Sequence, residues 1–401
     1  MQRVITGIDV LLTLDPENGE GPLGELRDAA VLLEDDRVLW IGASAQAPPA
    51  DERVDAAGCL VMPALVDMHT HAIWAGSRAG EFQQRLAGAD YTAILEAGGG
   101  ILSTVRHTRA AGDEALIAGC TARLARMRAR GVGAVEVKSG YGLSPEHEAR
   151  LLRCAREAGH RAGVRVLTTF LGAHAVPAEW RPDREGYVQH VIEEQLPLAA
   201  PHADFVDVYV DRGAFTVEEG ERILRAGQAI GLRARLHAEQ VERTGAAAMG
   251  ARIGALSADH LERLDADGID ALARAGTIAG LLPGAMLYLR DAAPPVAAFR
   301  EAGVRMAVAT DCNPGSSPVD DLWTAGTLAA VTMRLTVEEV LLGMTRHAAD
   351  ALGLADRGRI AVGSTGPLLV VEPPPAEPPS AAALVQHLGA PRLRAIVQHP
   401  G

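Results

Sequence analysis

The middle of this 401-residue chain alternates between short apolar runs and longer segments of helical pattern. Eight of these runs are typical of β-strands, and helical segments lie between most of them. One helical segment carries Leu116, Cys120, Leu124 and Met127 on a single face. Strands that alternate with helices favour a parallel sheet, and eight of them predict an α/β fold of the (β/α)8 barrel type. The expected strands span residues 61–67, 134–138, 166–171, 205–210, 233–237, 254–257, 277–281 and 305–310.

Both ends of the chain are rich in β-type runs separated by turn residues. Such runs cover residues 10–14, 30–33 and 37–42 near the N-terminus, and 367–371 and 393–397 near the C-terminus. We expect the two ends to pair into one small β-sandwich domain. Residues 1–60 and 358–401 would form this domain, and residues 61–357 would form the barrel.

Composition excludes several classes of protein. The formal net charge of −13 indicates an acidic surface, which argues against a nucleic-acid partner. No stretch reaches the roughly 18 apolar residues that a membrane span requires, and the N-terminus lacks the pattern of a secretory signal. The four cysteines show no Cys-x-x-Cys spacing, so neither a disulfide framework nor a thiolate zinc site is indicated. We expect a cytoplasmic protein that does not bind membranes.

Five ionisable residues fall at or just after the ends of the expected strands. His69 and His71, two positions apart, follow the first strand and would project together. His237 ends the fifth strand, His260 follows the sixth and Asp311 ends the eighth. In a barrel these ends meet at the face that carries the active site. Imidazoles and a carboxylate gathered there would suit a divalent metal ion.

This pattern resembles the amidohydrolase superfamily, and the segments around it are similar to the imidazolonepropionase family within it. Two blocks are characteristic of that family: Lys-Ser-Gly-Tyr-Gly at 138–142 and Asp-Cys-Asn-Pro-Gly-Ser at 311–316. Further similar segments lie at residues 82–91, 98–101 and 171–177. The resemblance runs from about residue 60 to residue 320.

The resemblance implies a metal site with one divalent ion, zinc or iron, per chain. Its ligands would be His69, His71, His237 and Asp311. Dinuclear relatives use a carboxylated lysine on strand four, but the expected fourth strand has no lysine. The only lysine of the chain, Lys138, falls on the second strand and would support the site from behind the ligands.

The implied reaction is hydrolysis of the cyclic amide C–N bond of 4-imidazolone-5-propanoate to N-formimidoyl-L-glutamate by a metal-activated water, the third step of histidine degradation. Asp311 would act as metal ligand and proton shuttle, and His260 would hydrogen-bond the water or polarise the carbonyl. Some family members have Glu at the position of Gln240, and a Gln cannot act as a base. If the backbone is extended here, we expect neighbouring Glu239 to point elsewhere, since adjacent side chains then alternate.

The substrate of this reaction is a small molecule with a carboxylate tail. The resemblance assigns Arg78 to that carboxylate, and the guanidinium fork suits it. The other implied contacts to substrate or product are Tyr141, His174, Gln240, Asn313, Gly315 and Ser316. Relatives also suggest a homodimer.

Three alternative readings stay open at this point. Another amidohydrolase, such as a deaminase or a different cyclic amidase, would keep the metal residues but lack the set of Arg78, Tyr141 and Asn313. A non-catalytic scaffold on the same barrel would usually have lost metal ligands. A metal-dependent binding protein without turnover would keep them.

Overall fold

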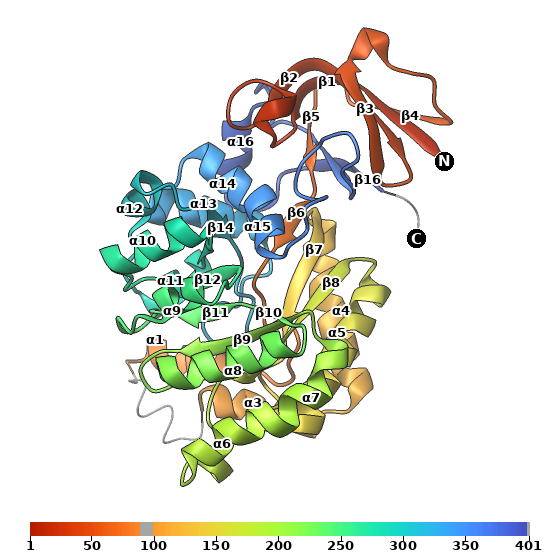
Figure 1. Ribbon diagram of the computed structural model, residues 1–401. Helices are drawn as coiled ribbons and strands as arrows, with labels where there is room; N and C mark the ends of the chain where they lie inside the picture. Colours follow the sequence, from red (N-terminus) through yellow and green to blue (C-terminus); the bar gives the residue numbers. More distant parts are fainter. Residues whose placement is uncertain (89–98, 399–401) are drawn as a thin grey trace.

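The computed structural model describes residues 1–88 and 99–398, and it contains two sheets (Figure 1). The larger sheet has nine strands in the order β14-β13-β12-β11-β9-β8-β7-β6, with β10 paired to β9. All of its neighbouring strands are parallel. Its strands are β6 (Leu65–Asp67), β7 (Val132–Lys138), β8 (Arg165–Ala173), β9 (Phe205–Val210), β10 (Arg233–Ala234), β11 (Leu236–Ala238), β12 (Ser257–His260), β13 (Ile278–Leu281) and β14 (Met306–Val308).

The two edges of this sheet meet beyond the ends of β6 and β14. Thr70 and Cys312 form a parallel bridge, and the amide of Asp311 donates to the carbonyl of His69 at 3.0 Å. Since β10 and β11 together make one interrupted strand, the sheet is an eight-stranded barrel, as predicted.

Helices surround the barrel strands and cover the outside of the sheet (Figure 1). Their ends carry the residues that satisfy free backbone groups: Thr216 and Glu219 form a capping box at the start of α8, and Gly163 ends α5 with φ of 65°. The face with Leu116 and Cys120 is buried, as predicted. The α-helices are α1 (Ala79–Leu86), α3 (Ile101–Ala110), α4 (Asp113–Ala129), α5 (Pro145–Ala162), α6 (Arg184–His190), α7 (Leu196–Ala199), α8 (Val217–Ala229), α9 (Ala246–Arg252), α10 (Ala266–Ala275), α11 (Pro283–Leu289), α12 (Val296–Glu301), α13 (Leu322–Met333), α14 (Val337–Gly343), α15 (Arg346–Ala351) and α16 (Ala381–Gln386).

The smaller sheet joins the two ends of the chain. Its order is β16-β15-β5-β1-β2-β3, and β4 also pairs with β1. Alternate residues of β1 face opposite sides: Ile5 and Leu11 belong to a separate small core, while Val10 and Leu12 pack into the main core. The strands are β1 (Gln2–Leu12), β2 (Glu25–Glu34), β3 (Arg37–Ala43), β4 (Glu52–Asp55), β5 (Leu60–Pro63), β15 (Leu368–Val371) and β16 (Leu393–Val397). The expected β-rich domain from both termini is therefore present, and its exact boundaries stay a prediction.

Most expected strands differ from the observed ones by only one or two residues at an end, but two of them differ in a way that affects the site or the sheets. The run at 61–67 is divided, because β5 pairs with β1 and β15 whereas β6 pairs with β7. The sixth barrel strand is β12 (Ser257–His260) rather than 254–257, so His260 ends this strand instead of following it. Within the described residues, no helix is long and apolar enough to cross a membrane.

Candidate active site

The four predicted metal ligands and the predicted catalytic residue His260 converge at the carboxyl ends of the barrel strands. His69 and His71 follow β6, His237 lies in β11, His260 ends β12 and Asp311 follows β14. All five are buried. The backbone at two of them is left-handed, with φ of 81° at His260 and 50° at Asp311. Such angles are uncommon outside glycine, and they often mark functional positions.

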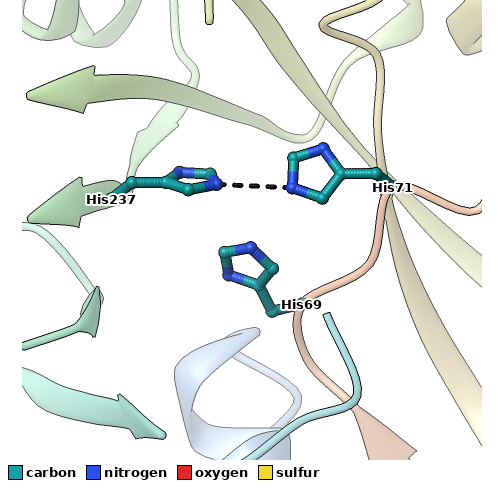
Figure 2. A group of neighbouring side chains, drawn as sticks. All are labelled: His69, His71 and His237. Carbon is teal, nitrogen blue, oxygen red and sulfur yellow. Dashed lines mark hydrogen bonds between the residues drawn. The ribbon is translucent and has the colours of Figure 1, made fainter. Parts of the chain in front are cut away.

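Three imidazoles form the centre of the site (Figure 2). His69, His71 and His237 each offer a ligand atom, and these atoms all lie within 4.8 Å of one another. The Nε2 atoms of His71 and His237 are 3.4 Å apart. One carboxylate oxygen of Asp311 lies 3.4 Å from His71 Nε2 and 3.6 Å from His69 Nε2. The structure thus brings together the four residues that the resemblance predicts to be metal ligands.

The protonation of this cluster suits a cation. Burial lowers the pKa of both His69 and His71 well below its usual value, so both rings are neutral at neutral pH. The buried Nε2 atom of His69 has no hydrogen-bond partner among the described residues. Its Nδ1 lies 2.7 Å from Asp259, and a carboxylate can only accept, so the Nε2 lone pair faces the cluster. Neutral imidazoles with inward lone pairs fit a divalent metal ion.

Behind the imidazoles lie charged residues that the sequence analysis missed. Asp259 accepts from His69 Nδ1, and Asp207 accepts from His237 Nδ1 at 3.0 Å. Lys138, expected behind the ligands, donates to Asp207 and to Glu136, each at 2.8 Å. Its ammonium group is therefore held in two ion pairs rather than directed at the imidazoles.

His260 borders the metal cluster without joining it. Its ring centroid lies 5.4 Å from that of His237 and 5.8 Å from that of His69. Burial lowers the pKa of His260 well below its usual value. Glu262 approaches its Nδ1 atom to 3.9 Å. A neutral imidazole here can donate or accept one hydrogen bond beside the cluster.

Two predicted substrate contacts, Tyr141 and His174, lie on the other side of His71. The rings of His71 and His174 stack with centroids 5.0 Å apart, and the Tyr141 ring lies 5.9 Å from that of His71. His174 Nδ1 donates to the carbonyl of Gly140, whose φ of 81° favours glycine and whose added β-carbon would lie 2.7 Å from His174 Nδ1.

A buried carboxylate that the sequence analysis did not identify shapes the loop around Tyr141. Glu148 accepts from the amides of Gly140, Gly142 and Leu143 at 3.0, 2.7 and 2.7 Å. The loop therefore wraps around one side chain of α5, which fixes where Tyr141 stands.

The predicted loop from Asn313 to Ser316 folds against Arg78. The side-chain oxygen of Asn313 accepts from the amides of Gly315 and Ser316, each at 2.8 Å. A β-carbon on Gly315 would lie 2.0 Å from Arg78 Nη1, so only glycine leaves room for the guanidinium. Arg78 also donates to Glu81 at 2.9 Å. The structure thus brings together four of the predicted contacts.

Gln240 and Glu239 point in different directions, as predicted, but the expected reason is wrong, because the backbone at Glu239 is left-handed, with φ of 54°, rather than extended. Gln240 accepts a hydrogen bond from Tyr209 at 3.0 Å. Glu239 turns away and accepts from the amide of Gly245 at 2.7 Å. The similar segments at 82–91 and 98–101 lie partly outside the described residues.

Comparison with known protein families and with curated proteins points to the same family as the sequence motifs. The model of the amidohydrolase family matches residues 60–388. An imidazolonepropionase from a Polaromonas species is 51% identical over 86% of this chain and 83% of the relative, and one from Cereibacter sphaeroides is 51% identical over 87% and 89%.

Solved structures agree on the fold. A zinc-bound adenosine deaminase from Xanthomonas campestris matches with a TM-score of 0.73 and 18% identity, covering 99% of this chain and 91% of that protein. A triazine hydrolase variant matches with a TM-score of 0.75 and 17% identity, covering 99% and 93%. At this identity, the likeness concerns the barrel and its accessory domain alone.

Proposed function

The chain belongs to the amidohydrolase family and, within it, to the imidazolonepropionases, and from this premise we propose how its residues carry out the reaction. The reaction is hydrolysis of the cyclic amide C–N bond of 4-imidazolone-5-propanoate to N-formimidoyl-L-glutamate, a step of histidine degradation. Three buried imidazoles beside a carboxylate, in a chain about half identical to these enzymes over most of its length, carry this conclusion.

His69, His71, His237 and Asp311 would hold one divalent ion, zinc or iron. The single-ion proposal is supported by Lys138, which is fully buried between Glu136 and Asp207. A divalent ion held here would lower the pKa of a water molecule and polarise the ring carbonyl.

Asp311 and His260 are the proposed proton-handling pair. Water adds to the ring carbonyl carbon, the C–N bond breaks, and the ring nitrogen gains the proton that water gives up. The carboxylate of Asp311 lies within 3.4–3.6 Å of two imidazoles, where it can take this proton and release it to the nitrogen. Neutral His260 would orient the water or the carbonyl oxygen. Gln240 cannot take the base role.

The propionate of the substrate would bind Arg78. The Arg78 side chain is only 17% exposed, Glu81 holds its Nε and Nη2 groups at 2.9 Å, and its Nη1 atom lies against Gly315, so the guanidinium is fixed beside this loop. Tyr141, His174 and Gln240 would contact the ring from the side of His71 and β11. Asn313 and Ser316 would complete the loop around the substrate or product.

A turnover assay tests this function. Protein loaded with zinc or with iron is mixed with 4-imidazolone-5-propanoate. The loss of the substrate's absorbance is followed together with the formation of N-formimidoyl-L-glutamate. We expect multiple turnovers and one metal ion per chain by elemental analysis. Binding without hydrolysis would overturn the enzyme assignment, and activity only on another cyclic amide or an aminated ring would reassign the substrate.

We also propose that the enzyme acts in the cytoplasm as a homodimer. The four cysteines are buried and unpaired, as suits a reducing compartment. Light scattering of the purified protein tests the dimer.

A further inference from the structure

Five charged side chains fill the barrel directly beneath the imidazoles, and the reaction as described does not use them. They are Glu136, Lys138, Asp207, Arg235 and Asp259, and each is fully buried. Isolated charges are costly to bury, so a cluster of this kind has to be internally paired. Its ion pairs and hydrogen bonds form two chains, here called lines. One line ends on His237 and the other on His69.

The first line runs from Lys138 to His237. Lys138 Nζ donates to Asp207 Oδ2 at 2.8 Å, and Asp207 Oδ1 accepts from His237 Nδ1 at 3.0 Å. Asp207 Oδ1 also lies 3.2 Å from the backbone nitrogen of His237, so one carboxylate fixes both the ring and its backbone.

The second line runs from Arg235 to His69. Arg235 Nη2 donates to Asp259 Oδ2 at 3.1 Å, and the same oxygen accepts from His69 Nδ1 at 2.7 Å. Arg235 and His237 stand two positions apart, so both project into the barrel, one below the other.

Lys138 reaches the remaining histidine segment through Glu136. Lys138 Nζ donates to Glu136 Oε1 at 2.8 Å, and Glu136 Oε2 accepts from the amide of Thr70 at 3.1 Å. Thr70 is the residue between His69 and His71, so this one ammonium group is linked through Asp207 to His237 and through Glu136 to the backbone that joins His69 and His71.

We propose that Lys138 and Arg235 are positioning residues that set the affinity and ligand geometry of the metal site by holding the carboxyl groups of Asp207 and Asp259 in place against the Nδ1 atoms of His237 and His69. This inference rests on the proposed metal site. An anionic acceptor at Nδ1 keeps the proton there, leaves the Nε2 lone pair free and makes the ring a stronger donor. Without the cations, these carboxylates would be unpaired charges in the barrel interior.

The identity of residue 138 supports this inference. The chain contains 37 arginines and a single lysine, and that lysine stands here. A compact ammonium can sit 2.8 Å from two carboxylates at once, whereas a planar guanidinium is wider and presents its donors as a fork. Arginine should therefore not substitute for lysine at this position, although arginine is the basic residue everywhere else in the chain.

The test measures metal binding rather than turnover. Lys138→Met, Lys138→Arg and the charge-balanced Lys138→Met/Glu136→Gln are compared with the wild type by zinc competition against a chromogenic chelator, and by the visible spectrum of the cobalt-substituted protein. We expect zinc dissociation constants about 10- to 100-fold higher in all three variants, with a changed cobalt spectrum. The double variant keeps the test valid if Lys138→Met alone fails to fold.

Arg346→Met is the matched control, because Arg346 forms an ion pair with Asp15 at 3.4 Å, away from the imidazoles. It should lower stability at most and leave the zinc dissociation constant unchanged. Folded Lys138 variants with wild-type zinc affinity and cobalt spectrum would overturn the inference. If the wild type itself binds no metal, the proposed metal site is wrong. If the wild type binds metal and turns over substrate while the variants have the same zinc affinity and cobalt spectrum, only this inference is wrong.

Discussion

Replacing Glu262 with glutamine should remove a pH-dependent loss of stability. Glu262 lies two residues after the end of β12, its side chain is 1% exposed, and its Oε2 atom has no hydrogen-bond partner among the described residues. Burial, assisted by the negative charge of Asp291, raises the pKa of this carboxyl from 4.5 to about 8. At neutral pH the folded protein therefore holds Glu262 mainly as a neutral acid.

The direction of this pH dependence follows from the pH at which Glu262 loses its proton in the unfolded and in the folded state. The unfolded chain loses it near pH 4.5 and the folded protein only near pH 8, so between these values the folded state binds more protons. The contribution of Glu262 to stability is complete below pH 4.5 and falls as the pH rises to about 8. At roughly 1.4 kcal/mol per pH unit, the loss is on the order of 5 kcal/mol.

Urea unfolding of the metal-free protein at pH 5, 6.5 and 8.5 measures this effect, since removing the metal avoids its own pH dependence. The stability of Glu262→Gln relative to wild type should rise steadily with pH. Glu242→Gln is the control, because the Glu242 side chain is 54% exposed and should show almost no pH-dependent difference. Parallel curves for Glu262→Gln and wild type would refute the reasoning, because they would mean that Glu262 ionises alike in both states.

Further predictions concern the reaction. Asp311→Asn should lower kcat by about 10²–10⁴-fold with the fold intact, and near-wild-type kcat in metal-loaded variant would exclude the proton shuttle. Arg78→Ala should raise KM by about 10- to 100-fold through loss of charged hydrogen bonds, and an unchanged KM would move the carboxylate site elsewhere. Gly315→Ala should raise KM similarly, because its methyl group would displace Arg78. Gly112→Ala, where a β-carbon has nothing within 4 Å, should leave KM unchanged.

Much of the barrel could be predicted from apolar runs, but not where one sheet ends and another begins. The run from Val61 to Asp67 is apolar on both sides of the point where it changes sheets. There the amide of Ala64 donates to Pro367, and the amide of Leu65 donates to Gly131. Both partners are distant in sequence, so the local pattern contains no signal of the change.

The residues proposed as metal ligands stand at or near strand ends, where a polar side chain interrupts an apolar run, and the family resemblance added their role. The supporting charges were harder to recognise. Asp207 lies within the run Phe-Val-Asp-Val-Tyr-Val, and Asp259 stands beside His260, so each passes for an isolated polar residue. The available signal was the charge itself, since a carboxylate inside a barrel strand has to find a partner.

The alternation of side chains along a strand accounts for some of the buried residues near the imidazoles but not for Asp259 and His260. Two-residue spacing correctly places Arg235 below His237, and Glu136 below Lys138, on the inside of the barrel. The same rule would send Asp259 and His260 to opposite faces, yet Asp259 contacts His69 and the ring of His260 lies beside that of His237. The left-handed φ of 81° at His260 breaks the alternation and lets two adjacent residues serve one site. Because that angle is maintained by the surrounding fold, alternation in the sequence cannot reveal the contact.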